Sequence, residues 1–143
     1  MKKFMLIGIL GLMVTANIYA QKSDVQLIEE TVFEFAKAGD NQDVKAFEKI
    51  LDVNYRVVMN RLFGGDKVAV LPRSVYLDKI KNKEFGGDKR EVTIHNITIN
   101  GTTANVKVTL KGEKMIFTSL LTLAKNGVGE WLLISDVPVL NKD

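Results

Sequence analysis

Hydrophobic positions in the first half of the chain beyond residue 20 recur at the spacing of a helix. Ser23 followed by Gln26 forms a capping-box pattern, which predicts that a helix begins there. Its apolar face continues to Gly39, where a helix can end in a left-handed turn. Asp40 and Asn41 are then expected to cap a second, shorter helix that folds back on the first. The apolar stripes are Val25, Ile28, Val32, Phe35 and Ala36, then Val44, Phe47, Ile50 and Leu51.

From Tyr55 the hydrophobic period changes to two, which is typical of a strand. Tyr55, Val57 and Met59 alternate with a second, more polar set of positions. A Gly-Gly-Asp turn then predicts a short return strand over residues 67–71. Pro72 suits the first turn of a third helix, because its ring already holds the helical φ angle. The residues that this helix places inward are Tyr76, Leu77 and Ile80.

Everything after residue 90 has the pattern of an antiparallel meander of four strands. The apolar positions of the first strand switch parity midway, which predicts a bulge near His95 and Asn96. Asn100-Gly101 is a strong hairpin pattern. In the last two strands, residues 115–123 and 131–139, both parities carry apolar residues. We therefore expect these two strands to be central and covered on both faces, with the lysine-rich strand nearer an edge.

Residues 1–20 have the layout of a secretory signal peptide. Two lysines precede an apolar run over residues 4–14, and smaller residues follow and end at Ala20. The run is too short to span a membrane, so we expect cleavage near Ala20 and no membrane span in the mature chain. The alternative is an uncleaved amphipathic anchor. The prediction is an exported protein, periplasmic or secreted, whose single domain covers residues 21–143.

The charge balance limits the partners of this mature domain. The full chain has 20 basic and 17 acidic residues, and the removal of the two lysines in residues 1–20 leaves 18 basic residues and a net charge of +1. Such a domain exerts little long-range attraction on phosphates, so a nucleic-acid partner is not expected. The chain also has no cysteine and therefore no thiol nucleophile or disulfide. No cofactor motif occurs, and a lone histidine predicts no metal centre.

The inferred order is helix, helix, strand, strand, helix and four strands, an α+β arrangement. The segments that carry a family resemblance are Gly39-Asp40, Asp52-Val53-Asn54-Tyr55-Arg56-Val57, Asn100-Gly101, Ala104-Asn105-Val106 and Gly129-Glu130-Trp131-Leu132-Leu133-Ile134. Over about residues 24–137 the chain resembles the NTF2-like superfamily, and most closely the small bacterial proteins called putative lumazine-binding or SnoaL-like. The resemblance implies a cone, in which a curved antiparallel or mixed sheet of about six strands wraps over three helices.

The resemblance also implies a pocket between the concave sheet and the helices, mostly apolar with a few polar groups. Such a pocket would take a small apolar or aromatic molecule. The residues that we expect to contact this ligand are Tyr55, Met59, Tyr76, Phe117 and Trp131. Two of them have a plain structural alternative. Tyr55 could be a core aromatic with its hydroxyl at the surface, and Trp131 could be a packing anchor.

Catalytic candidates are few. Ketosteroid isomerase, a relative with known chemistry, places a tyrosine hydroxyl on its first helix, but the aromatic residues here are Phe33 and Phe35. His95 would need an orienting partner to act as a base, and the adjacent Asn96 points to the opposite face. The alternative is that His95 is a half-exposed strand residue at a bulge.

Asp136 is the second catalytic candidate. It shares strand parity with Leu132 and Ile134, so it could lie on a buried face near the mouth of a pocket. Desolvation there would raise the pKa of the carboxyl group and suit it to act as a base. Alternatively, the side chain could cap the end of the strand before Pro138.

Three classes of function fit the sequence. We favour an exported small-molecule binding or accessory protein without chemistry of its own, because the sequence places no base, nucleophile, metal set or cofactor motif on a fold that provides a cavity. The second class is a small-molecule isomerase, dehydratase or hydrolase of the SnoaL-like type. The third is an interaction module that dimerises through its open sheet. In that case Val137, Val139 and the outward apolar residues of 117–123 would form the dimer interface. A homodimer is the expected assembly.

Overall fold

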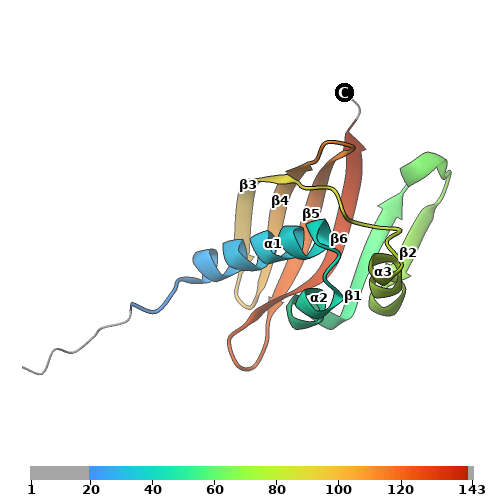
Figure 1. Cartoon of the computed structure of the whole chain (residues 1–143). Helices are drawn as coiled ribbons and strands as arrows, with labels where there is room; N and C mark the ends of the chain where they lie inside the picture. The colour runs from blue at the N-terminus through green and yellow to red at the C-terminus, as the bar shows by residue number, and fades with distance from the viewer. Residues whose placement is uncertain (1–19, 142–143) are drawn as a thin grey trace, which may run out of the picture.

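The described residues form a six-stranded sheet and three α-helices. Figure 1 shows the helices on one face of the sheet. This computed structural model describes residues 20–141, so the predicted signal peptide lies outside the described residues except for Ala20. The sheet order is β2-β1-β6-β5-β4-β3, and only the β1–β6 pair is parallel. The predicted α+β fold is therefore confirmed. The elements are α1 (Asp24–Asp40), α2 (Val44–Ile50), β1 (Leu51–Asn60), η1 (Leu62–Gly64), β2 (Val68–Pro72), α3 (Arg73–Lys81), β3 (Glu91–Asn100), β4 (Thr103–Lys111), β5 (Ile116–Lys125) and β6 (Trp131–Asn141).

Helix α1 begins at the predicted capping box, where Ser23 and Gln26 cap each other. The prediction for α2 was wrong, because its cap is Asp43, whose carboxylate accepts a hydrogen bond from the backbone N–H of Ala46 at 3.0 Å. Asp40 belongs to the last turn of α1, and its carboxylate forms an ion pair with Arg90 in the segment before β3. The left-handed residue between the helices is Gln42, at φ 52°, and not a glycine.

The predicted bulge in β3 is confirmed, since Ile94 pairs with Val108 and Asn96 with Lys107, which leaves His95 without a partner in the register. The hairpin that follows is also present, with Asn100 paired to Thr103.

A second bulge lies in β6 and was not predicted. Leu133 pairs with Leu123, and Ser135 pairs with Thr122, so Ile134 is the extra residue. The bulge shifts the parity of everything after it. Asp136 therefore shares its face with Leu133, not with Ile134 as the sequence pattern suggested.

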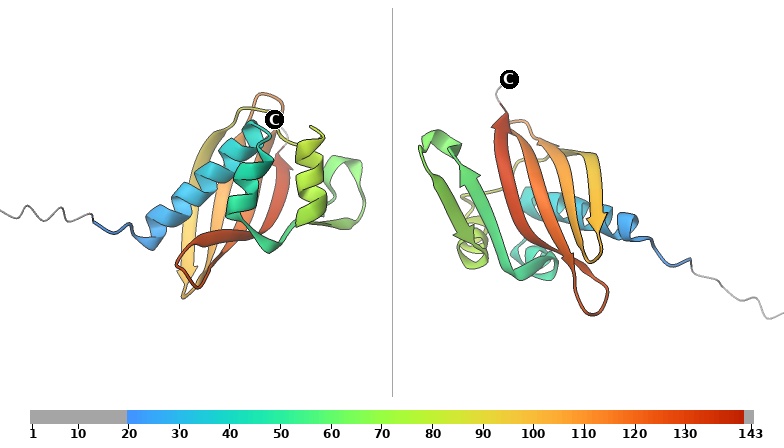
Figure 2. Two further views of the ribbon diagram at one scale, coloured as in Figure 1. Left: turned by 60° about the horizontal axis from the view of Figure 1, so that its bottom comes forward. Right: turned by 180° about the vertical axis from the view of Figure 1, so that it is seen from behind.

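The core lies on the concave side of the sheet, where α1 crosses the strands (Figure 2). Strands β5 and β6 are central, as predicted. The expectation that both of their faces are covered was wrong for the single chain, because all three helices lie on the concave side (Figure 2). On the convex side Leu120 is 55% exposed and Val139 is 58% exposed. The apolar residues of both parities thus divide into a buried set and an open patch.

Candidate functional site: a pocket in the concave sheet

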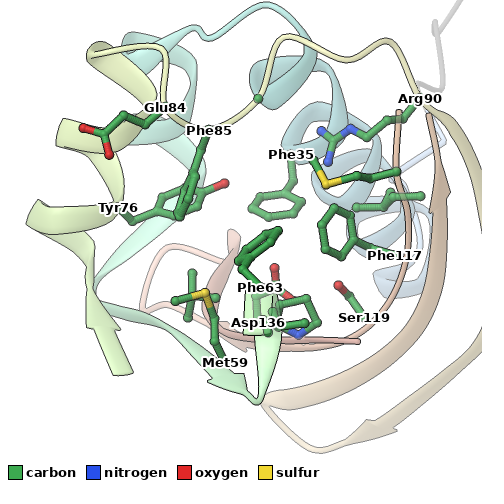
Figure 3. A pocket seen from close by; sticks show the side chains of 16 residues that line it. Phe35, Met59, Phe63, Tyr76, Glu84, Phe85, Arg90, Phe117, Ser119 and Asp136 are labelled. Carbon is green, nitrogen blue, oxygen red and sulfur yellow. The ribbon is translucent and has the colours of Figure 1, made fainter. Parts of the chain in front are cut away.

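A cavity of about 380 Å³ lies between the concave sheet, α3 and the hairpin that joins β1 to β2. Its walls are mostly apolar, and side chains from α1, β1, η1, α3, β4, β5, β6 and the segment before β3 meet there (Figure 3). The aromatic residues of the lining are Phe35, Phe63, Tyr76, Phe85 and Phe117, and the polar or charged ones are Glu84, Arg90, Ser119 and Asp136. An apolar cavity of this size with few polar groups has the properties of a small-molecule site.

Aromatic rings form the mouth and one wall. Tyr76 and Phe85 lie with their ring centroids 6.1 Å apart. Phe63 at the hairpin tip meets Phe117 of β5 edge-on, with a centroid separation of 6.5 Å. Phe63 is 60% exposed and has φ 52°, a left-handed conformation that is unfavourable for a residue with a Cβ atom. The hairpin therefore holds an aromatic ring over the cavity at a cost in backbone energy.

Asp136 lies at the floor of the cavity on β6. It is only 7% exposed, and its Oδ1 atom is buried with no hydrogen-bond partner among residues 20–141. Burial raises the pKa of this carboxyl group to about 7, while the neighbouring Ser119 hydroxyl and the charge of Arg90 lower it in part. Ser119 is diagonal to Asp136 across the β5–β6 pair, and both face the cavity (Figure 3).

Arg90 reaches the cavity from the segment before β3, and two contacts hold it. Its Nε atom donates to Asp40 Oδ1 at 2.6 Å, and Nη2 donates to the backbone carbonyl of Ala36 at 2.7 Å. The guanidinium passes so close to Gly39 that a Cβ atom at that position would collide with it. The guanidinium charge is therefore matched by Asp40, and the side chain is fixed in the wall.

Two tyrosine rings meet edge to face beside the cavity. Tyr76 lines the cavity, and Tyr55 lies in the core with its ring centroid 5.4 Å from that of Tyr76. Burial raises the pKa of both phenols above the ordinary value, so both hydroxyls stay neutral at physiological pH. The Tyr55 hydroxyl has no hydrogen-bond partner in the described part of the chain.

The structure separates the residues that the sequence proposed for the site. Met59, Tyr76, Phe117 and Asp136 all line the cavity. Tyr55 lies behind Tyr76, whereas His95 and Trp131 lie elsewhere in the molecule.

His95 is exposed at the β3 bulge, and its Nε2 atom is 2.7 Å from the Thr109 hydroxyl. Trp131 is buried at the opposite end of the sheet, where its indole N–H donates to Asp24 Oδ1 at 3.0 Å. The buried ring and its hydrogen bond to Asp24 agree with the alternative that Trp131 is a packing residue.

Sequence reasoning missed Phe63, Phe85, Arg90 and Ser119. Phe63 and Phe85 lie in turns, where no periodicity marks an inward face. Arg90 had a usable indication in the Gly86-Gly87 pair before it, because such a pair permits a close crossing of two segments. The nitrogen of Gly87 donates to the Gly39 carbonyl at 2.9 Å at this crossing.

Within residues 20–141 no group of three or more acidic or histidine side chains could hold a metal ion. In the same range no helix has the length and hydrophobicity that crossing a bilayer requires.

The curved six-stranded sheet over three helices defines an NTF2-like fold, and solved structures agree. An NTF2-like protein of unknown function from Shewanella baltica has 20% identity and a TM-score of 0.72, over 86% of this chain and 100% of that chain. A ketosteroid isomerase-like protein from Erwinia carotovora atroseptica has 14% identity and a TM-score of 0.67, over 86% and 100% of the two chains. A CaMKII hub from S. rosetta has 17% identity and a TM-score of 0.64, over 85% and 99%. At such identities these likenesses establish the fold alone.

The chain belongs to the family described as "Putative lumazine-binding", whose model matches residues 23–137. Among curated proteins, none matches the sequence closely enough to count as a relative.

Proposed function

We propose that this protein is an exported binding or accessory protein that holds a small, largely apolar or aromatic molecule in its pocket. The observation that carries the proposal is the cavity of about 380 Å³, whose aromatic walls enclose a floor with a few polar groups. Ligand sites have this combination of volume and lining. The export part rests on the sequence pattern of residues 1–20 alone.

The description of the family makes lumazine the first ligand to test. Lumazine is a flat bicyclic ring with N–H and carbonyl groups at its edge. Phe117 and Tyr76 offer faces and edges for such a ring, and Ser119 and Asp136 offer hydrogen-bonding groups at the floor.

The test is binding of Nile red, a neutral fluorescent probe, followed by competition with lumazine. Met59→Trp should narrow the cavity and weaken probe binding by about tenfold or more, equivalent to about 1.4 kcal/mol. Asn60→Trp is the matched control, since the adjacent strand position faces the convex side and should leave the affinity unchanged. Equal probe affinity in the wild type and both variants would place binding outside the cavity and refute the proposal.

An enzyme that transfers protons on a small molecule is the second candidate. It is favoured by Asp136, because a carboxyl group with a pKa of about 7 can give or take a proton near neutral pH. Tyr76 brings to the same cavity a hydroxyl group that the first helix does not supply. The test is isomerisation of a β,γ-unsaturated ketone, followed by its ultraviolet absorbance. An enzyme would lose turnover in Asp136→Asn, and a pure binding protein would show none in either form.

For the assembly we favour a homodimer that pairs the convex faces of two sheets. Val70 pairs with Val58, and Val137 pairs with Leu120, so apolar side chains form a row across four strands. Sedimentation of the mature protein tests this assembly. A dimer that Leu120→Glu converts to a monomer supports it, and a monomeric wild type contradicts it.

A further inference from the structure

Among the described residues that line the pocket, Asp136 is the charged group that has no ion-pair partner. Among the described residues that line the cavity, Arg90 is paired with Asp40 at 2.6 Å. Glu84 at the rim is paired with Lys79 at 2.7 Å and is exposed to water. Asp136 has no salt bridge within residues 20–141, and its Oδ1 atom has no hydrogen-bond partner there.

A buried carboxylate with an orphan oxygen is costly unless something donates to it. The protein groups that face Asp136 offer little. Ser119 supplies one hydroxyl, and the guanidinium of Arg90 is already engaged by Asp40 and the Ala36 carbonyl. Within residues 20–141 neither the Tyr76 nor the Tyr55 hydroxyl donates to Asp136 Oδ1. The partner missing from this site is a hydrogen-bond donor, and the strongest donor would be a cation.

The walls suit the same kind of partner. Aromatic rings from four elements surround the space above Asp136 (Figure 3). Ring faces attract positive charge, and this attraction strengthens where water is excluded. An anionic ligand would instead meet the repulsion of the carboxylate, and no unpaired cation from residues 20–141 lines the cavity to receive it.

We propose that the pocket selects small aromatic or apolar molecules that carry a protonated or N–H-donating nitrogen, with Asp136 as the counter-ion and Ser119 beside it. This inference rests on the proposed binding function, because it names the chemical class of the ligand for the same cavity. Among such ligands a protonated amine should bind most tightly, and a neutral heterocycle that donates through its ring N–H should bind more weakly.

The pH dependence follows from the state of the carboxyl group. Its pKa of about 7 means that Asp136 is mostly protonated in mild acid and mostly ionised above neutral pH. A cation binds the ionised form, so its affinity should fall as the pH drops below about 7. Neither Tyr55 nor Tyr76 changes its charge in this range, because burial raises the pKa of both phenols.

The experiment uses three naphthalene ligands of matched shape: 2-naphthylmethylamine, 2-naphthylmethanol and 2-naphthoate. Their affinities are measured by displacement of Nile red from the mature protein at about pH 8 and about pH 5.5. We expect the amine to bind about tenfold more tightly than the alcohol at the higher pH, and the carboxylate to bind most weakly. The preference for the amine should shrink at the lower pH.

Two variants assign the preference to its source. Asp136→Asn keeps the shape of the side chain and removes its charge, so the amine and the alcohol should bind equally at both pH values. Glu34→Gln removes a negative charge on the exposed face of α1, away from the cavity, and should keep the wild-type preference. If the wild type binds the alcohol as tightly as the amine at about pH 8, or binds 2-naphthoate best, this inference is overturned while the pocket stands. If neither Nile red nor any naphthalene binds, the proposed function fails with it.

Discussion

The two halves of the concave face differ sharply, although they belong to one sheet. At the end where α1 begins, side chains fill the space, and the polar groups there are paired. Trp131 donates to Asp24, which also accepts from Lys125 Nζ at 2.8 Å, and Thr31 donates to the Trp131 carbonyl at 3.1 Å. At the other end a cavity lies between the sheet, α3 and the β1–β2 hairpin. The buried Asp136 Oδ1 there has no hydrogen-bond partner within residues 20–141.

This difference assigns stability to one half and recognition to the other. A filled and satisfied half contributes burial and paired hydrogen bonds to folding. An unfilled half with an orphan carboxylate lowers stability, and a ligand can recover that energy by supplying the missing contacts.

The largest effect is expected in the filled half. Trp131→Ala should lower the free energy of unfolding by about 3–5 kcal/mol, because it opens a large cavity and leaves Asp24 with one partner fewer. Denaturation in urea measures it, with Trp131→Phe as a milder control. An unchanged unfolding midpoint would mean that the indole faces solvent or a ligand.

In the half that contains the cavity, a substitution should raise the free energy of unfolding instead of lowering it. Asp136→Asn should raise the free energy of unfolding at about pH 8 by about 2–4 kcal/mol, because burial raises the folded-state pKa of the carboxyl from 3.8 to about 7. A group with a raised pKa stabilises the fold fully below the unfolded value and loses that contribution as the pH climbs through the folded value. The gain should therefore disappear near pH 4. Destabilisation at about pH 8 would show that the ionised carboxylate has partners in the folded state.

The crossing of the Gly86-Gly87 segment over Gly39 supports the cavity wall, and a substitution there should lower stability moderately. Gly86→Ala should cost about 2–3 kcal/mol, since the residue has φ 77° and a Cβ atom would collide with the Gly39 carbonyl. Gly64→Ala is the matched control, because Gly64 has φ 82° with open space around it, and the cost there should be about 1 kcal/mol. Thermal unfolding compares the two variants, and equal losses would remove the collision from the explanation.

The smallest change in stability is expected at the mouth. Phe63→Ala should alter the free energy of unfolding by less than about 0.5 kcal/mol, because the ring is largely exposed. Nile red should nevertheless bind several-fold more weakly, since the ring that meets Phe117 over the cavity is lost. An unchanged probe affinity would indicate that the hairpin tip takes no part in binding.

The elements themselves were largely predictable from the sequence. Three helices, their order among the strands, the β3 bulge and the hairpin at Asn100 follow from periodicity and turn residues, which are local properties. The site was predictable only in part. Met59, Tyr76 and Phe117 lie on the expected faces, but Phe63 and Phe85 lie in turns that no pattern orients.

What the sequence by itself determined is therefore which segments form helices and strands and which strand positions are apolar. The tertiary structure decided which apolar positions are buried in the core and which line the cavity. The extra residue at Ile134 turns Asp136 inward, and the paired glycines let Arg90 cross Gly39 and enter the wall. Both effects depend on contacts between segments far apart in the chain. Local propensity cannot specify such contacts, because the distance between two elements depends on everything packed between them.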